Sequence, residues 1–349
     1  MKNMIVIFTL LLSSMNVFSA TEGPLNKGMI NPGFYEKPTW FKDSFLELQA
    51  DLNDANDQGR KIILYFHQDG CPYCKKLLDD NFTRKDIVSK MSQKFDLLEI
   101  NMWGDKTVTS LTGEELAEKE FAKKMKIMFT PTLIVLDDKG NEQFRMNGYY
   151  APDKFSAALD YVLLKSEKDI SFNDFYHQQQ NKSQAESKLH TEAIIYKGND
   201  LRRLIKNSNK AVIILFEQGD CLECDELHGD IFRRLPVYKK LQQFSVTQIN
   251  INSDKVIITP DGQSMTEKQL AESVNIQYTP SIFFYDKQDK NSEKRLVFRS
   301  EGYLKGFHIQ ALFDYISSKA YLSEPEFQRF VQQRADKMRK EGVKVELWE

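Results

Sequence analysis

Residues 62–76 read IILYFHQDGCPYCKK, and residues 212–226 read VIILFEQGDCLECDE. Both stretches begin with five apolar residues rich in β-branched side chains, which predicts a strand buried on both faces. Both continue with two cysteines separated by two residues, and then with the apolar spacing of a helix. The order strand, Cys-x-x-Cys, helix therefore occurs twice, 150 residues apart.

The elements that follow also occur twice. Each copy is predicted to continue with a strand, a helix, a Thr-Pro dipeptide that opens another strand, a hairpin and an amphipathic helix. In the first copy the strand, the helix, the Thr-Pro segment with its strand, and the amphipathic helix are residues 97–102, 114–125, 130–136 and 152–165. In the second copy they are residues 245–251, 266–274, 279–285 and 306–318. The hairpin turn lies between the last two elements of each copy. Because parallel strands need a helical crossover, this order predicts an α/β fold with a mixed β-sheet flanked by helices in each copy.

The length of the chain agrees with two tandem domains. At 349 residues it is too long for one ordinary hydrophobic core. We predict a signal peptide, a first domain, a polar linker or helix, a second domain, and a charged C-terminal helix with a tail; the boundaries are 1–20, 21–170, 171–192, 193–320 and 321–349.

The first 20 residues have the layout of a secretory signal peptide. Lys2 is followed by an apolar run over residues 5–12 and by a small-residue end at residues 17–20. The run is shorter than the roughly 20 residues of a membrane-spanning helix. We therefore expect a cleaved signal and export to the periplasm; an uncleaved anchor is the alternative.

Every cysteine belongs to one of the two pairs, Cys71 with Cys74 and Cys221 with Cys224. A cysteine in the first turn of a helix meets unpaired backbone N–H groups and the positive end of the helix dipole, and both favour the thiolate. Cys71 and Cys221 are predicted as exposed attacking sulfurs, and Cys74 and Cys224 as buried resolving ones. The pattern indicates a redox-active centre.

Two other interpretations of the cysteines compete with redox chemistry. Paired Cys-x-x-Cys motifs bind zinc in many proteins, but here 146 residues separate the pairs. The second competing interpretation is that each pair forms an inert local disulfide. We predict no metal and no other cofactor.

The Thr-Pro dipeptides are interpreted as substrate-binding turns. We expect Thr130-Pro131 and Thr279-Pro280 to have cis peptide bonds and to face the sulfurs, since a cis bond implies a specific geometric need. The missing N–H of proline also leaves room for a substrate backbone. An ordinary proline at the start of a strand is the alternative.

The two pairs are not expected to be chemically equal. Pro72 suits the first turn of a helix, and Tyr73 and His67 are predicted to modulate the first site. A solvated histidine is the alternative for His67. Around the second pair stand five carboxylates, which should oppose thiolate formation at Cys221: Glu217, Asp220, Glu223, Asp225 and Glu226. Cys71 is therefore predicted to be the more reactive thiol.

Four stretches carry a resemblance to a known family, namely residues 68–75 (QDGCPYCK), 101–105 (NMWGD), 129–132 (FTPT) and 302–305 (GYLK). In these stretches the chain resembles the thioredoxin-like proteins of the bacterial sulphur-oxidation (Sox) system, and more broadly the periplasmic thioredoxin-related family, here as a tandem duplication. The resemblance covers about residues 40–165 and 195–320. Two departures are that Tyr65 and Leu215 stand where cytosolic thioredoxins have a buried acid.

The resemblance implies a periplasmic dithiol reductant that reduces disulfides of cysteine-containing client proteins and is itself reduced by a membrane thiol–disulfide electron donor. The Pro-Tyr dipeptide also occurs in glutaredoxins and disulfide isomerases, so it does not fix the direction of the reaction. A disulfide isomerase or oxidase that uses both domains is the alternative, and a non-catalytic client-binding protein is a further one. Within the enzyme interpretation, an internal relay that passes electrons between the two domains is a third possibility. The nearly balanced charge of −2 argues against nucleic acid as a partner.

Overall fold

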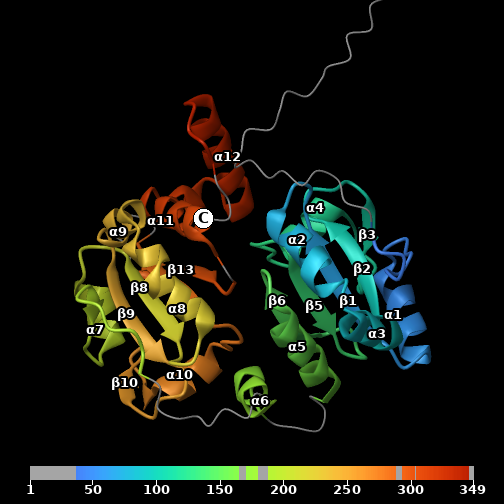
Figure 1. Ribbon diagram of the computed structural model, residues 1–349, viewed down its shortest axis with the longest axis horizontal. Helices are drawn as coiled ribbons and strands as arrows, with labels where there is room; N and C mark the ends of the chain where they lie inside the picture. Colours follow the sequence, from blue (N-terminus) through green and yellow to red (C-terminus); the bar gives the residue numbers. More distant parts are fainter. Residues whose placement is uncertain (1–36, 165–169, 180–187, 288–292, 303, 346–349) are drawn as a thin grey trace, which may run out of the picture.

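The computed structural model describes residues 37–164, 170–179, 188–287, 293–302 and 304–345. They form two α/β domains that lie side by side (Figure 1). The predicted signal peptide, part of the predicted linker and the end of the C-terminal tail fall outside the described residues. Within the described residues, no helix combines the length and the apolar composition needed to cross a membrane.

The first domain is built on a four-stranded mixed sheet in the order β2-β1-β5-β6. The central strand β1 (Lys61–His67) runs parallel to β2 (Phe95–Asn101) and antiparallel to β5 (Thr132–Leu136), which pairs with the edge strand β6 (Glu142–Asn147). The remaining elements are α1 (Leu48–Asp57), α2 (Pro72–Lys76) with a π-helical turn (Leu77–Asn81), α3 (Lys85–Lys94), β3 (Thr107–Thr109), β4 (Glu115–Ala117), α4 (Glu118–Lys124) and α5 (Pro152–Leu164).

The second domain repeats this plan with one more strand, in the order β13-β12-β8-β9-β7. Its central strand β8 (Val212–Glu217) is parallel to β9 (Ser245–Asn250) and antiparallel to β12 (Ser281–Asp286). The other elements are β7 (Ile195–Tyr196), α7 (Leu201–Asn207), α8 (Leu222–Gly229), α9 (Leu235–Leu241), β10 (Val256–Ile258), β11 (Ser264–Thr266), α10 (Glu267–Ser273), β13 (Arg295–Ser300), α11 (Gly306–Ser317) and α12 (Phe327–Lys340), with 3-10 turns at Ile231–Arg233 and Ala320–Leu322.

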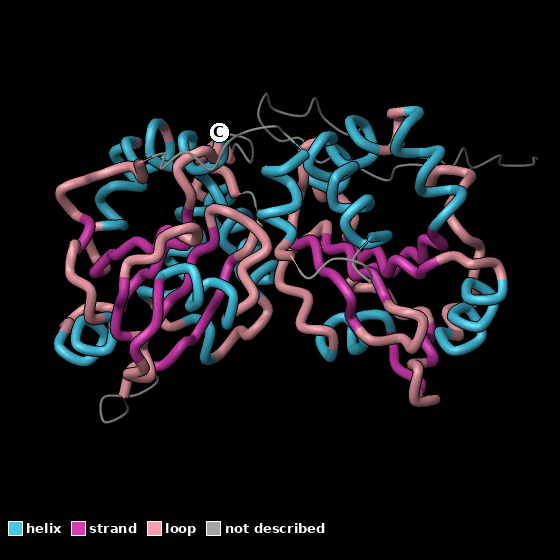
Figure 2. Tube along the Cα trace, turned by 90° about the horizontal axis from the view of Figure 1, so that it is seen from below, coloured by secondary structure: helices cyan, strands magenta, loops and turns pink. Residues whose placement is uncertain are grey.

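Each sheet is a central layer with helices on both faces (Figure 2). Successive residues of β1 point to opposite faces, so Ile63 and Tyr65 join one buried cluster while Ile62, Leu64 and Phe66 join another. The predicted α/β fold class and its doubling are therefore confirmed.

Two stretches differ from the predicted elements. Residues 115–117 are not the first turn of a helix but strand β4, because they pair with β3 in a separate two-stranded ribbon. The predicted polar linker or helix begins as helix α6 (Phe172–Gln179), but this helix is not only polar, because its Phe172 and Phe175 are buried in the core of the first domain. Periodicity reports which residues are apolar, but not which element covers them.

Each domain inserts an aromatic side chain into the core of the other. Phe129 belongs to the main cluster of the second domain, where its ring centroid lies 6.0 Å from Phe298 and 5.6 Å from Phe327. Tyr278 belongs to the main cluster of the first domain and lies 5.1 Å from Tyr150. Phe129 and Tyr278 both stand directly before a Thr-Pro dipeptide, so the two insertions are reciprocal.

The helices that end the two copies reinforce this exchange from opposite ends of the interface (Figure 1). In α6, the Asn173 side-chain amide donates to the carbonyl oxygen of Ile276 in the second domain at 3.2 Å. In α12, the Arg329 guanidinium lies 4.7 Å from the ring centroid of Trp103 in the first domain. The two equivalent helices thus each reach across to the opposite domain, although they contact different parts of it.

We expect Phe129→Ala to destabilise the second domain, although residue 129 belongs to the first. Deleting a buried phenyl group costs about 3–5 kcal/mol, and here the cavity opens beside Phe327 in α12. Hydrogen exchange should therefore show faster exchange in α12. Phe121→Ala, in the other cluster of the first domain, is the control and should leave α12 protected. Faster exchange confined to the first domain in Phe129→Ala would contradict this packing.

Candidate redox site

The first cysteine pair lies where β1 gives way to α2. Cys71 is the N-cap of α2, and its Sγ accepts the backbone N–H of Cys74 at 3.0 Å. The Thr130 hydroxyl donates to the same Sγ at 3.4 Å. The bond before Pro131 is cis, as predicted, and the Thr130 hydrogen bond places this turn beside the sulfur. That the turn binds substrate stays a prediction. The carbonyl oxygen of Thr130 also lies 3.4 Å from this sulfur. In the reduced protein the Cys74 N–H and the Thr130 hydroxyl are the groups that can donate to a Cys71 thiolate.

The second pair has the same backbone arrangement but a different partner pattern. Cys221 is the N-cap of α8, and its Sγ accepts the N–H of Cys224 at 3.0 Å. The Thr279–Pro280 bond is also cis. Among the described atoms, however, the buried Thr279 hydroxyl has no hydrogen-bond partner, whereas its equivalent Thr130 donates to a sulfur. Both pairs are disulfide-bonded in this structure.

The expected exposure of the attacking sulfurs is wrong for this arrangement. Cys71 is only 2% exposed and Cys221 only 4%. The first pair shares a buried cluster with Tyr278 of the second domain, and its neighbours Pro72 and Tyr73 are buried too. The physical reason is the packing of one domain against the other, which a sequence read one copy at a time does not include.

Tyr73 is the point at which the second domain reaches the first site. Its hydroxyl accepts the backbone N–H of Lys305 at 3.1 Å and lies 3.4 Å from His308 Nδ1. Burial raises the pKa of Tyr73, and burial lowers the pKa of His308 to about 4. Both side chains are therefore neutral at neutral pH, and the contact is a hydrogen bond rather than an ion pair.

His67 is not the solvated histidine of the sequence alternative. It is 8% exposed, its Nε2 lies 3.2 Å from Glu99, and its ring stacks on Tyr65. Burial is the main reason that the pKa of His67 falls to about 4. A neutral imidazole supplies no charge to a neighbouring thiolate, so any influence of His67 on the first site comes from packing and hydrogen bonding.

The carboxylates around the second pair are partnered. Glu217 accepts from His228 at 2.8 Å, Asp225 pairs with His190 at 2.7 Å, and Glu226 pairs with Lys305. Glu223, which stands between the two cysteines, lies 3.9 Å from Lys154 of the first domain. These partners offset part of the negative field that the sequence predicts at Cys221. That Cys71 is the more reactive thiol stays a prediction.

A buried ion network fastens α8 to the segment that precedes the second domain. His228 is 1% exposed and lies between Glu217 and Glu192, with the latter 3.0 Å from its Nδ1. Burial alone would lower the pKa of His228, but the hydrogen bonds and charges of the two carboxylates outweigh it and raise the pKa.

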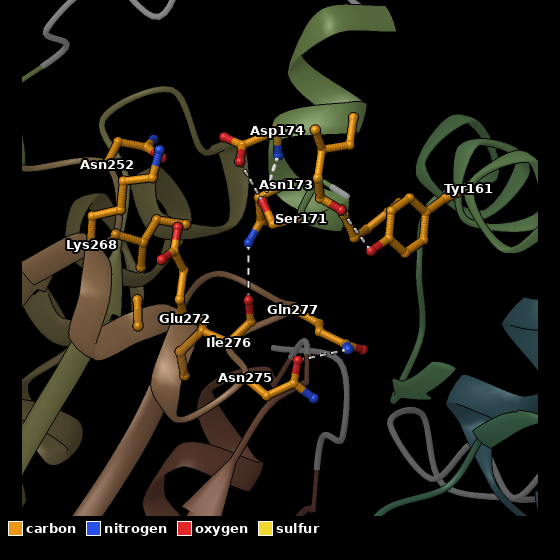
Figure 3. Close-up of a pocket in the computed structure, with 14 residues that line it drawn as sticks. Tyr161, Ser171, Asn173, Asp174, Asn252, Lys268, Glu272, Asn275, Ile276 and Gln277 are labelled. Carbon is orange, nitrogen blue, oxygen red and sulfur yellow. Dashed lines mark hydrogen bonds between the residues drawn. The ribbon is translucent and has the colours of Figure 1, made fainter. Parts of the chain in front are cut away.

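A polar cavity of about 440 Å³ lies at another part of the interface, between α6 and the second domain. Lys268, Glu272 and Asn275 are among its lining residues, and the Asn173 hydrogen bond to Ile276 crosses it (Figure 3). None of its lining residues is a cysteine, so it is not the redox site. Among the described residues, no group of three or more His, Cys, Asp and Glu side chains is arranged to hold a metal ion.

The residues that sequence reasoning missed reach a pair across the interface: Lys154 lies near the second pair, and Tyr278, Lys305 and His308 lie near the first. Lys305 also pairs with Glu226 of its own domain. One signal was available. Lys154 and His308 occupy the same position of the closing helix in the two copies, 154 residues apart. Nothing in the sequence, however, says that the closing helix of one copy faces the cysteines of the other.

Comparison with known proteins agrees with the geometry. A family model described as a thioredoxin-like domain matches residues 48–163 and again residues 198–317. The chain belongs to the thioredoxin-like family. With a Cys-x-x-Cys pair in each matched domain, it is a thiol–disulfide oxidoreductase.

Individual relatives are more distant. The thiol:disulfide interchange protein DsbD of Actinobacillus pleuropneumoniae is 26% identical over 114 residues, which is 32% of this chain and 18% of that protein. This chain thus matches less than a fifth of the length of that relative. A thioredoxin-fold protein from Helicobacter pylori is 16% identical, with 41% of this chain and 93% of that chain covered at a TM-score of 0.35. The C-terminal domain of Neisseria meningitidis DsbD in its oxidised form is 17% identical, with 35% and 97% covered at a TM-score of 0.26.

We expect Thr130→Val to raise the pKa of the Cys71 thiol by about one unit, because a hydrogen bond to a charged group contributes roughly 1.5–3 kcal/mol. The measurement is the pH midpoint of alkylation of Cys71 in the reduced protein, followed by peptide mass spectrometry. Thr279→Val is the matched control, since the Thr279 hydroxyl has no partner to lose. Equal shifts at Cys71 and Cys221 would contradict the assigned difference.

The His228 network predicts a pH dependence of stability. A histidine with a raised folded-state pKa contributes stability that is complete below its unfolded pKa and is lost as the pH rises through the folded value. The difference in unfolding free energy between the wild type and His228→Gln should therefore shrink from about pH 6.5 upward.

His67 should show the opposite pH dependence, because its folded-state pKa is lowered. The difference in unfolding free energy between the wild type and His67→Gln should shrink as the pH falls from about 6.5 to 4. Two slopes of the same sign would refute these assignments.

Proposed function

We propose that the protein is an exported dithiol reductase of protein disulfides, with Cys71 and Cys74 as its main pair. The observation that carries this proposal is the set of donors on one sulfur, since Cys71 Sγ accepts both the Cys74 N–H and the Thr130 hydroxyl. In the reduced protein the Cys71 thiolate attacks a client disulfide and forms a mixed disulfide. Cys74 then attacks Cys71 and releases the client as a dithiol.

The two pairs have different roles in this proposal. The second pair, Cys221 with Cys224, is less reactive in this proposal, because Thr279 does not donate to its sulfur and the cations that partner Glu217, Glu223 and Glu226 offset only part of the negative charge near it. The turns at Thr130-Pro131 and Thr279-Pro280 bind the client backbone. Pro72, Tyr73 and His67 influence the first site through packing and hydrogen bonding and do not take part in the disulfide exchange.

Export and partners follow from the sequence of the first 20 residues and from the resemblance to periplasmic thioredoxins, including those of the Sox system. The similarity to a thiol:disulfide interchange protein supports cysteine-containing clients. A membrane thiol–disulfide donor that keeps the first pair reduced is part of this proposal.

The reduction potential of each pair tests the direction of the reaction. The variant Cys221→Ser with Cys224→Ser isolates the first pair, and Cys71→Ser with Cys74→Ser isolates the second. A reductase should have a first pair near the roughly −270 mV of thioredoxin. A value near about −120 mV would instead support the oxidase alternative, and one near about −180 mV the isomerase alternative.

A separate measurement addresses the non-catalytic alternative. We expect Cys71→Ser to abolish reduction of a model protein disulfide, because the attacking sulfur is lost. Cys221→Ser is the matched control and should retain most of the activity. If Cys71→Ser reduced the substrate as fast as the wild type, the assignment of the first pair would fail.

A further inference from the structure

The two cysteine pairs meet the same interface in the same way. The second residue between the cysteines is Tyr73 in the first pair and Glu223 in the second. Tyr73 contacts His308 of the second domain at 3.4 Å, and Glu223 contacts Lys154 of the first domain at 3.9 Å. Because Tyr73 matches Glu223 and His308 matches Lys154 in the repeat, these two contacts are equivalent. The starts of α2 and α8 therefore face opposite domains across one surface.

One residue, Lys305, links the surroundings of the two pairs. The Lys305 backbone N–H donates to the Tyr73 hydroxyl, between the cysteines of the first pair. Its Nζ pairs with Glu226, which stands two residues after Cys224. The path from one pair to the other thus runs through a single lysine.

Buried contacts hold the same region together from the first domain. The Lys154 side chain is 8% exposed, and its Nζ lies 4.1 Å from the ring centroid of Tyr278, directly before Thr279-Pro280. Burial lowers the pKa of Lys154, although Glu223 opposes that effect. Burying a charged lysine costs free energy, so buried lysines occur where neighbouring groups interact with them and fix their position. The region between the two pairs is thus a packed interface.

In this arrangement the sulfurs are closed to a large client. Cys71 and Cys221 are 2% and 4% exposed, and the first pair is buried in a cluster that includes Tyr278. Disulfide exchange requires access of one sulfur to another. For each pair, the redox group on the other side of the interface is the other cysteine pair of the same chain.

We propose that the two pairs exchange electrons directly, so that the protein is an internal disulfide relay. The proposal rests on both pairs being redox-active, as proposed above, but not on the direction of the overall reaction. This exchange requires one domain to rotate on the other at the interface, because both sulfurs are buried in the present arrangement. The relay then passes electrons from a pair that is a dithiol to a pair that is a disulfide.

The step balances without any outside reagent. With the first pair reduced, the Cys71 thiolate attacks Cys221 Sγ; the Cys71–Cys221 bond forms, the Cys221–Cys224 bond breaks, and Cys224 leaves as a thiolate. The Cys74 thiolate then attacks Cys71 Sγ and releases Cys221. Two electrons pass to the second pair, and the two protons lost by the first pair are taken up by the second. The reverse step follows the same path.

The full chain carrying Cys74→Ser tests the relay. This variant keeps the second disulfide and leaves Cys71 as the remaining thiol. A relay should therefore set up an equilibrium between the Cys221–Cys224 disulfide and the mixed disulfide of Cys71 with Cys221, and rapid alkylation of the freed Cys224 traps the mixed disulfide. Peptide mass spectrometry should find that cross-link, with Cys224 freed and alkylated. Cys71→Ser is the matched control, because it leaves one thiol on Cys74, which is fully buried. We expect the control to give at most about a tenth of the cross-link, since attack needs an accessible thiolate.

Two further arms separate the relay from other outcomes. The yield and rate should not change when the protein is diluted about tenfold, because linked domains react at a fixed effective concentration. Cross-links between chains, seen as dimers without reductant, would overturn an internal relay. Gly302→Leu in the Cys74→Ser chain should lower the yield several-fold, because a Cβ at residue 302 would lie 2.9 Å from the carbonyl oxygen of Asn147 across the interface.

Failure of the relay and failure of the proposed function give different results. If the Cys74→Ser chain is folded, as judged by circular dichroism, and forms no Cys71–Cys221 cross-link, the relay is overturned. A first pair with a reductase potential would still support the proposed function in that case. A cross-link together with an oxidising potential would support the relay and overturn the reductase.

Discussion

The structure depends on one reciprocal exchange, in which the residue before each cis-proline turn packs in the core of the opposite domain. Phe129 completes a cluster with Phe298 and Phe327, and Tyr278 completes one with Tyr150. The first of these turns also lies beside Cys71, because the Thr130 hydroxyl donates to its Sγ. A movement that opens the interface therefore also withdraws an aromatic ring from each core, so access to the sulfurs and stability of the fold are linked.

The spacing of apolar residues along the sequence predicted the strands and helices well, because the periodicity of a strand or helix depends only on residues close together in the chain. The strands at residues 62–66 and 212–216, the cis bonds before Pro131 and Pro280 and the closing helices are all present. The errors concern surfaces. Residues 115–117 pair with a ribbon strand, and Cys71 is covered by another domain. Tertiary contacts decide such features, and one copy of a repeat does not contain them.

The site shows the same limit in its electrostatics. A count of carboxylates along the sequence near Cys221 gives a strongly negative surrounding. In the fold, Lys154 and Lys305 come from elements far away in the chain and partner Glu223 and Glu226. His67, which a sequence places beside Cys71 as a possible cation, is neutral because it is buried. Charge near a sulfur is therefore a property of the packed interface.

The two sites also differ in how they meet solvent, and this bears on how a duplicated redox protein divides its work. Leu222, directly after Cys221, is 80% exposed, whereas the equivalent Pro72 is buried. The second pair thus has an edge that faces outward while the first pair is enclosed. In a symmetric dimer both sites would be equally covered. Fusion of the two copies in one chain removes that restriction, because each copy can change its sequence independently. Duplication therefore lets one interface hold two unequal pairs, which is the condition for electrons to pass between them in a preferred direction.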